Sequence, residues 1–293
     1  MADARESRQD AITEDEMTGT AVPASSTSTG TEPTLKTSNA FTTLMSPRKS
    51  KRRSEQFNKV PNKPSTGQTT TFLGRDGLGA YIASPAAFPA SRVIYHTEKF
   101  VVINDLYPKS SVHLLLLPRD PTKTCLHPFE ALEDTAFLAE VLVEVKKLRE
   151  LAARELRRRF GTFSRKDKAR EAAMDLEPVP AEHDLPPGRD WEKEVVSGVH
   201  AHPSMNHLHI HIISKDRVNE CMRHRKHYNS FATPFFVPVE DFPLDPKDKR
   251  RHPGHEGYLG SDLLCWKCGK TFRNKFARLK EHLEEEFHVW KGE

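Results

Sequence analysis

The feature that most constrains the fold is a run of alternating histidines, "SMNHLHIHIIS", at residues 204–214. His207, His209 and His211 occupy every second position, and alternation with a period of two predicts a β-strand with one buried face. We therefore expect the three imidazoles to lie together on the side of the strand opposite the core. Such a row of histidines forms a metal site or a site that binds and reacts with phosphate groups, or else it arises by accident from the composition. The apolar residues expected in the core are Leu208, Ile210 and Ile212.

The bulk composition describes a chain that is long enough for one or two domains but folds only in part. Its 293 residues allow a sizeable core, whereas a hydrophobic content of 36% is below the globular average. The formal charge of +4 mildly favours an anionic partner. Four cysteines at this length do not suggest a disulfide scaffold, so we expect a reducing, intracellular setting. No apolar run is long enough to span a bilayer and the first residues lack a signal-peptide pattern, so we expect a soluble protein that is not secreted.

Three regions are expected along the chain. Residues 1–70 are rich in Ser, Thr and Pro and too poor in large apolar residues to offset the entropy of ordering them. Residues 71–245 are expected to form the main domain, with a polar surface insertion at about 161–191, and residues 246–293 form a basic C-terminal segment. In the tail, "SPRKSKRRS" predicts a nuclear-import signal or a tether for nucleic acid, or else a solvated charge run. We expect a nuclear location, with the cytoplasm as a second one, and the sequence leaves the partners of the tail unknown.

The main domain is expected to be of the α+β class. "RVIYHTEKFVVINDLYPKSSVHLLLLPRD" predicts two or three strands, and "KEVVSGVHAHPSMNHLHIHIIS" predicts two more that are joined by a turn at Pro203. Between them, residues 129–160 have apolar side chains at helical spacing and charged side chains on the other face. Strands, a helix and strands again favour an α+β domain.

Three histidines on one face of a strand are suited to phosphate chemistry. A neutral imidazole attacks phosphorus to give a covalent phosphoramidate, which water then hydrolyses. Such an enzyme needs donors for the phosphate oxygens and a group that protonates the leaving oxygen. Upstream, "GVHAHPSM" supplies His200 and Ser204, which the turn at Pro203 can fold over the same site. A zinc site with three histidine ligands is geometrically allowed as well, although nothing in the sequence singles out a metal there.

The pattern His-φ-His-φ-His-φ-φ, in which φ is apolar, resembles the signature of the histidine-triad superfamily of nucleotide hydrolases and transferases. "VVINDLYPKSSVHLLLLPR" is similar to the nucleotide-binding strand pair of that superfamily. The resemblance implies a domain with an antiparallel sheet and helices. In it His209 is the nucleophile, while His207 and His211 orient it and bind phosphate oxygens. The nucleotide-binding residues that the resemblance implies are Asp105, at the ribose, Lys109 and His113.

The C-terminal segment carries the opening of a small zinc finger. "CWKCGKTFRNKFARLKEHLEEEFH" contains Cys265-x2-Cys268 and, further on, His282. A segment this short cannot form a core of its own, so one structural zinc ion per chain is expected. Glu286, at i+4, shares a helical face with His282, whereas His288 lies most of a half-turn away. We favour Glu286 as the fourth ligand and keep His288 as the alternative; two free thiols beside a surface helix are the remaining interpretation.

A histidine-triad domain followed by a zinc finger is similar to the aprataxin family, and above all to fungal-type members that lack the forkhead-associated domain. "GVHAHPSMNHLHIHIIS", "RKHYNSFATPFFV" and "CWKC…LKEHLEEEF" resemble segments of that family. The resemblance implies a DNA-repair hydrolase that acts on the phosphoanhydride of 5′-adenylated DNA ends left by abortive ligation. It releases AMP and a 5′-phosphate end through a covalent histidine–AMP intermediate. It also implies that His200 assists departure of the DNA phosphate and that Ser204 holds a phosphate oxygen; the 161–191 insertion has no clear counterpart.

Basic residues after the histidine strand and through the finger predict a surface that follows the phosphates of nicked or broken duplex DNA without reading its sequence. Phe72 is expected to stack on the terminal base pair, or else to belong to the core. Arg223 stands where family members often carry Lys. The second function considered is a general nucleoside phosphoramidate or dinucleoside polyphosphate hydrolase, and the third is a DNA-binding adaptor with a degenerate site. The predicted DNA contacts are Arg223, Lys226, His227 and Phe72, within a basic set that also includes Lys215, Arg217, Arg225, Lys247, Lys249, Arg250 and Arg251.

Overall fold

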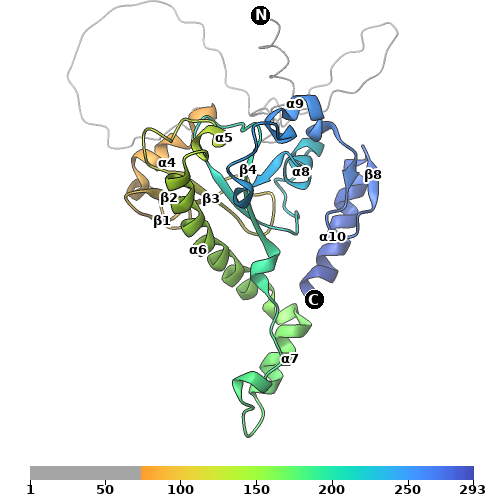
Figure 1. Ribbon diagram of the computed structural model, residues 1–293. Helices are drawn as coiled ribbons and strands as arrows, with labels where there is room; N and C mark the ends of the chain where they lie inside the picture. Colours follow the sequence, from red (N-terminus) through yellow and green to blue (C-terminus); the bar gives the residue numbers. More distant parts are fainter. Residues whose placement is uncertain (1–73) are drawn as a thin grey trace, which may run out of the picture. The chain divides into compact units, whose positions relative to one another are not determined.

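The computed structural model describes residues 74–293. A six-stranded sheet with the order β1-β2-β3-β5-β4-β6 forms the centre of the fold (Figure 1), and every neighbouring pair in it is antiparallel. The expected α+β class and antiparallel sheet are therefore confirmed. The strands are β1 (Val93–His96), β2 (Phe100–Asn104), β3 (His113–Pro118), β4 (Val195–His200), β5 (Ile210–Ser214) and β6 (Phe236–Pro238).

One face of the sheet is covered by the long helix α6 (Thr135–Phe160). Asp134 starts this helix, since its carboxylate accepts the backbone N–H groups of Ala136 and Phe137. The apolar side of α6 packs against β5 in the main core, and each such buried side chain stabilises the fold by about 1.5–3 kcal/mol. The predicted helix at 129–160 is in fact two helices, because the Asp134 cap separates α6 from the short α5 (Pro128–Ala131).

The opposite face of the sheet carries the histidines. A smaller apolar cluster lies there, in which Leu78 and Tyr81, at the start of and within α4 (Gly79–Ala83), pack on Ile103 and Leu115. In the register of β3 with β5, Leu115 is paired with His211, so His211 points to this second face. The predicted alternation therefore holds, with Leu208, Ile210 and Ile212 in the main core.

The histidine strand is shorter than the sequence pattern suggests. β5 begins only at Ile210, so His207 and His209 precede it. The backbone N–H of Leu208 donates to the carbonyl of Thr124 (2.8 Å) rather than to a neighbouring strand. The hydrogen bond to Thr124 thus keeps residues 207–209 extended. Their side chains therefore alternate in the same way as those of β5, although β5 begins only at Ile210.

The polar segment at 161–191 contains a helix, α7 (Arg165–Met174), and its base is not a surface feature. Asp167 and Trp191 are buried, with only 1% and 4% of their surfaces exposed. The outer part of this segment is exposed, as predicted for a surface insertion. Its base, which includes Asp167 and Trp191, is buried, and there the prediction is wrong.

The C-terminal part contains α8 (Arg225–Ala232), α9 (Pro253–Glu256), the hairpin β7 (Leu263–Leu264) and β8 (Thr271–Arg273), and α10 (Phe276–Gly292). Trp290 of α10 belongs to the same main core as Leu148 of α6. The segment expected at 246–293 thus shares a core with the histidine-triad part. Within residues 74–293, no helix combines the length and the apolar character that a membrane span requires.

Candidate active site

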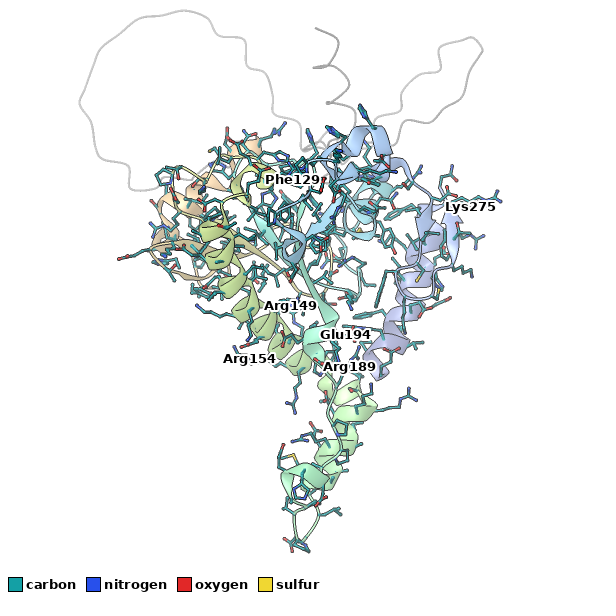
Figure 2. All side chains as sticks on the ribbon, in the orientation of Figure 1. Phe129, Arg149, Arg154, Arg189, Glu194 and Lys275 are labelled. Atoms are coloured by element: carbon teal, nitrogen blue, oxygen red, sulfur yellow. The ribbon has the colours of Figure 1, made fainter. Side chains whose placement is uncertain are left out.

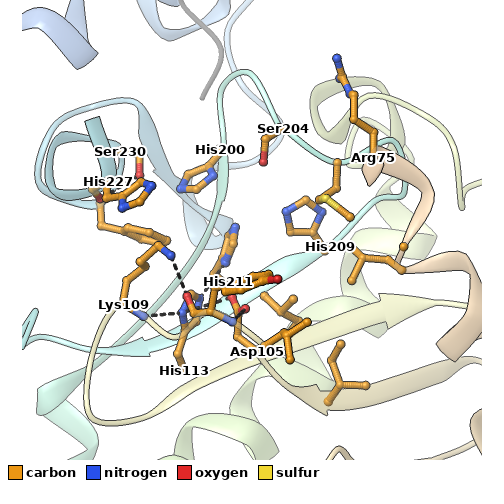
Figure 3. A pocket seen from close by; sticks show the side chains of 18 of the residues that line it. Arg75, Asp105, Lys109, His113, His200, Ser204, His209, His211, His227 and Ser230 are labelled. Carbon is orange, nitrogen blue, oxygen red and sulfur yellow. Dashed lines mark hydrogen bonds and ion pairs between the residues drawn. The ribbon is translucent and has the colours of Figure 1, made fainter. Parts of the chain in front are cut away.

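A pocket on the second face of the sheet brings together most of the predicted catalytic and nucleotide-binding side chains (Figure 3). One side of it is apolar and includes Leu78, Tyr81, Ile103 and Met205. The other side is lined with polar groups from β3, β4, β5 and the loops that follow β2 and β4. Those predicted residues that line the pocket are Asp105, Lys109, His113, His200, Ser204, His209, His211 and His227.

His209 is held in one tautomer by the backbone of its neighbour. Its Nδ1 lies 2.7 Å from the carbonyl oxygen of His207. Because a carbonyl only accepts, Nδ1 carries the proton and Nε2 carries the lone pair. Burial lowers the pKa of His209 below 6.5, and the hydrogen bond to His207 opposes this shift in part. His209 is therefore a neutral imidazole with a free nucleophilic nitrogen at neutral pH.

His211 is fixed in the opposite tautomer by a relay from β3. The backbone N–H of Lys109 donates to Nδ1 of His113 (3.1 Å), so the proton of His113 is on Nε2. That Nε2 lies 2.9 Å from Nδ1 of His211, which must accept. The Nε2–H group of His211 is then buried without a hydrogen-bond partner among residues 74–293. Burial lowers the pKa of His113 to about 4 and that of His211 well below 6.5, so the relay is neutral.

His200, at the end of β4, completes the polar wall of the pocket. Its ring centroid lies 4.5 Å from that of His211 and 4.7 Å from that of Phe231. Burial holds the pKa of His200 well below 6.5, and its Nε2 is a second buried nitrogen without a hydrogen-bond partner in the described part of the chain. A bound phosphate anion favours the protonated form of such a group and accepts its hydrogen bond.

Asp105 and Lys109 lie in the turn between β2 and β3. The carboxylate of Asp105 accepts the backbone N–H of Tyr107 (2.8 Å) and approaches Nδ1 of His113 at 3.3 Å. The ammonium of Lys109 is buried and donates to the carbonyl of Tyr107 (2.8 Å). Burial lowers the pKa of Lys109, and Asp105 opposes that shift. Asp105 and Lys109 therefore supply one carboxylate and one cation to the lining of the same pocket.

Not all predicted residues reach this pocket. The His207 ring lies against the backbone of α4, where a Cβ on Gly79 would come within 2.8 Å of its Nε2; glycine is required there, and His207 acts on the site through its carbonyl. Phe72 lies outside the described residues. Arg223 precedes α8 and Lys226 lies in its first turn, and neither of them lines the pocket; His227 lines it but is fully buried and accepts the N–H of Arg223 (3.2 Å).

The predicted basic surface contains one clear error, Arg217. Its side chain is buried; it donates to the carbonyls of Ser214 (2.6 Å) and Phe231 (3.3 Å), and its guanidinium lies 5.6 Å from the Phe231 ring. Phe231 in turn packs edge-on against His113 and His211. Arg217 therefore supports the histidines from behind and does not face DNA. Phe231, Ser230 and Tyr81 line the pocket but were not predicted as site residues; Ser230 and Phe231 lie in the family-like segment "RKHYNSFATPFFV", whereas no motif marks Tyr81.

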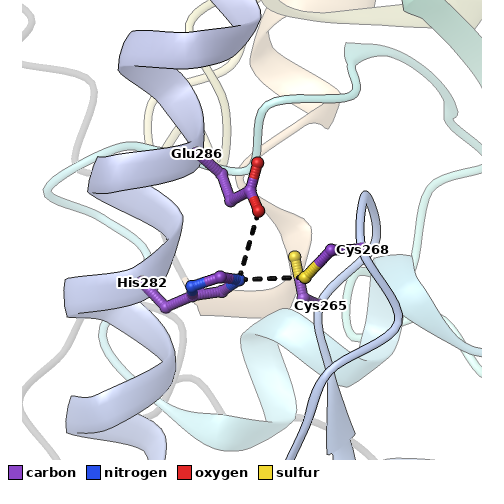
Figure 4. Close-up of side chains that lie close together, drawn as sticks. All are labelled: Cys265, Cys268, His282 and Glu286. Atoms are coloured by element: carbon purple, nitrogen blue, oxygen red, sulfur yellow. Dashed lines mark hydrogen bonds and ion pairs between the residues drawn. The ribbon is translucent and has the colours of Figure 1, made fainter.

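The predicted metal ligands form a second cluster (Figure 4). One ligand atom from each of Cys265, Cys268, His282 and Glu286 lies within 4.8 Å of all the others. Sγ of Cys268 is 3.1 Å from Nε2 of His282, which is 3.5 Å from a Glu286 oxygen. Two thiols, an imidazole and a carboxylate suit tetrahedral zinc. His288 is exposed and outside this cluster.

In the pocket, Asp105, His113 and His211 also lie close together. The facing nitrogens of the two histidines, however, are hydrogen-bonded to each other.

Comparisons with known proteins identify two domains in this chain. Residues 89–218 match the HIT domain family, and residues 232–289 match the C2HE / C2H2 / C2HC zinc-binding finger. An aprataxin-like protein of Schizosaccharomyces pombe is 35% identical over 261 residues, which are 87% of this chain and 95% of the relative. One of Saccharomyces cerevisiae is 35% identical over 216 residues, 73% and 96% of the two chains.

Comparisons with solved structures also find aprataxin-like proteins. A crystal structure of the aprataxin ortholog Hnt3 in complex with DNA matches with a TM-score of 0.59 and 33% identity, over 74% of this chain and 96% of that one. A structure of Hnt3 in complex with DNA and guanosine matches with a TM-score of 0.57 and 32% identity, over the same shares of the two chains. The coverage is nearly complete on the side of the relatives. The chain therefore belongs to the aprataxin family.

Proposed function

We propose that this protein is a DNA-repair deadenylase that removes AMP from adenylated DNA 5′ ends through a covalent intermediate on His209. The observation that carries the proposal is the tautomer of His209, whose free Nε2 lines a pocket in which His211 presents an N–H group. A nucleophile and an oxyanion donor next to each other are what phosphoryl-group transfer to a histidine requires.

In the first step, Nε2 of His209 attacks the phosphorus of the AMP group and the bond to the DNA phosphate oxygen breaks. The new phosphoramidate leaves the imidazole positively charged, and the His207 carbonyl accepts the Nδ1–H more strongly as this charge develops. The Nε2–H of His211 donates to a non-bridging oxygen, and His200 hydrogen-bonds to the departing 5′-phosphate. In the second step water cleaves the P–N bond, which releases AMP and restores His209.

The apolar side of the pocket suits a nucleobase, and Asp105 at the rim suits ribose hydroxyl groups. Outside the pocket, exposed cations continue through the finger and match the phosphates of a duplex. The exposed cations in β8 and at the start of α10 are Arg273, Lys275 and Arg278. Adenylated, nicked or broken duplex DNA is therefore favoured over small nucleoside phosphoramidates or dinucleoside polyphosphates, which need no such surface.

In the finger, Cys265, Cys268, His282 and Glu286 would hold one structural zinc ion. When bound, the metal joins the hairpin β7–β8 to α10 and takes no part in the chemistry of the pocket.

We assign a nuclear location from the basic cluster in the tail, which lies outside the described residues.

The experiment that tests the function compares two substrates at matched concentrations. A nicked duplex with a 5′-adenylated end should be hydrolysed with a far higher kcat/KM than adenosine 5′-phosphoramidate, and the products should be AMP and a ligatable 5′-phosphate. Equal kcat/KM values for both substrates would instead support a general phosphoramidate hydrolase.

A further inference from the structure

The C-terminal end of the finger helix is attached to the rest of the protein through Phe287 and Trp290, which pack on Phe160, and through one buried arginine. The guanidinium of Arg189 lies against two indole rings, 4.2 Å from the ring of Trp191 and 4.7 Å from that of Trp290, and the two rings also meet each other edge to face with their centroids 5.9 Å apart. Arg189 donates to the backbone carbonyl of Trp290 and pairs with Glu194 at 3.1 Å. The Trp290 indole donates to the same carboxylate (2.7 Å). Figure 2 shows Arg189 and Glu194 beside the end of α10.

The base of the insertion holds this arginine in place. Asp167 of α7 is buried and accepts both the backbone N–H of Arg189 (2.9 Å) and the indole N–H of Trp191 (2.7 Å). A guanidinium that is buried against two rings gains from cation–π attraction that is strengthened by the absence of water. The segment from Asp167 to Trp191 is therefore built around the contact with Trp290.

Trp290 is one helical turn beyond Glu286 and two turns beyond His282, on the same side of α10. The helix that carries the finger's metal ligands is thus fixed at its far end by Arg189. At its near end, Leu279 and Leu283 pack on Met222 and Tyr228, next to the histidine pocket. The exposed cation Lys275, labelled in Figure 2, moves with this helix.

We propose that Arg189 is a positioning residue for DNA binding: by clamping Trp290 to Trp191 it sets where the cations of the finger lie relative to His209. This inference rests on the proposed function, and it gives the insertion base a role in substrate binding without any contact to substrate. Arg189→Ala removes the clamp. Arg189→Lys keeps the charge but lacks the planar guanidinium that contacts both rings and donates to Trp290 and Glu194, so it tests the geometry in a less disruptive way.

The test uses the full-length, zinc-containing protein. In Arg189→Ala we expect the Kd for nicked duplex DNA and the KM for adenylated DNA to rise about 5- to 20-fold. Arg189→Lys should show a smaller rise, and kcat/KM for adenosine 5′-phosphoramidate should stay unchanged in both variants. Amide hydrogen exchange at the end of α10 should become faster. Lys166→Ala, which removes an exposed cation of α7, should match the wild type.

Two results would overturn the proposal. The first is faster exchange at the end of α10 with an unchanged Kd for DNA, because the clamp would then not position the finger. The second is an equal loss on both substrates, because Arg189 would then serve only overall stability. The Kd is measured on a nick with a plain 5′-phosphate, so it tests the clamp even if the wild type fails to hydrolyse adenylated DNA.

Discussion

The imidazole of His209 donates from Nδ1 to the backbone carbonyl oxygen of His207 at a distance of 2.7 Å. The proposed nucleophile is therefore oriented by a neutral main-chain group and not by a carboxylate. A carbonyl fixes the tautomer without raising the basicity of the ring as strongly as a carboxylate would. Together with burial, this keeps Nε2 unprotonated and available at neutral pH.

Replacing His209 with Asn should abolish turnover, by about 10⁴-fold or more, because no nucleophilic nitrogen remains at that position. Binding of adenylated DNA should change little, since cations outside the pocket hold the duplex. Quench-flow on radiolabelled AMP–DNA should show protein-bound label in the wild type and none in the variant. His96→Asn, at an exposed histidine, is the matched control. Undiminished turnover in His209→Asn would remove His209 from the role of nucleophile.

His113→Asn should lower kcat by about 10- to 100-fold with a smaller effect on KM, the size usually seen when a group that orients a site residue is lost. Without the relay, Nδ1 of His211 takes up the proton in part of the molecules, and its Nε2 then has no hydrogen to donate. His183→Asn, in the exposed part of the insertion, should have wild-type kinetics. A variant with normal kcat would show that the relay does not set the tautomer of His211.

The loss of rate at acidic pH should be centred below pH 6.5. Protonation of His209 abolishes its nucleophilicity, and burial lowers the pKa of this imidazole below its ordinary value. The measurement is kcat/KM against pH for adenylated DNA, with folding monitored at each pH. An acidic limb centred above pH 6.5 would contradict a lowered pKa of His209.

Glu286→Ala should lose zinc or bind it far more weakly, whereas His288→Ala should retain one zinc ion per chain. Only Glu286 lies in the ligand cluster, one turn beyond His282. Metal analysis after dialysis against a chelator gives the answer without any assay of activity. Zinc loss from His288→Ala and retention by Glu286→Ala would mean that the finger uses two cysteines and two histidines.

The affinity for nicked duplex DNA should fall by about tenfold or more between ~50 and ~200 mM salt and should not depend on base sequence, because counterion release dominates contacts to phosphate. Lys275→Ala should reduce the slope of log K against log salt by about one. Arg217→Lys should leave that slope unchanged, since this side chain is buried. A flat salt response would rule out the proposed basic surface.

Local patterns in the sequence were enough to predict the sheet face of the histidines, the amphipathic helix α6 and the zinc cluster. Each depends on residues that are close in sequence, where strand or helix periodicity decides the geometry. The relay from His113 to His211 depends instead on the register of β3 with β5. Arg217 was misassigned because sequence alone does not tell a solvated cation from one that packs against Phe231. The clamp of Arg189 joins residues from Asp167 to Trp290, and no local pattern reveals it.

The presence of Trp290 in the same core as Phe100 has a consequence for how the chain folds as it is made. A ribosome releases the strands first, and the core is complete only when α10 has also left the exit tunnel. Until then the nascent chain exposes the apolar surface that Trp290 covers in the folded protein, and surface exposed in this way favours aggregation.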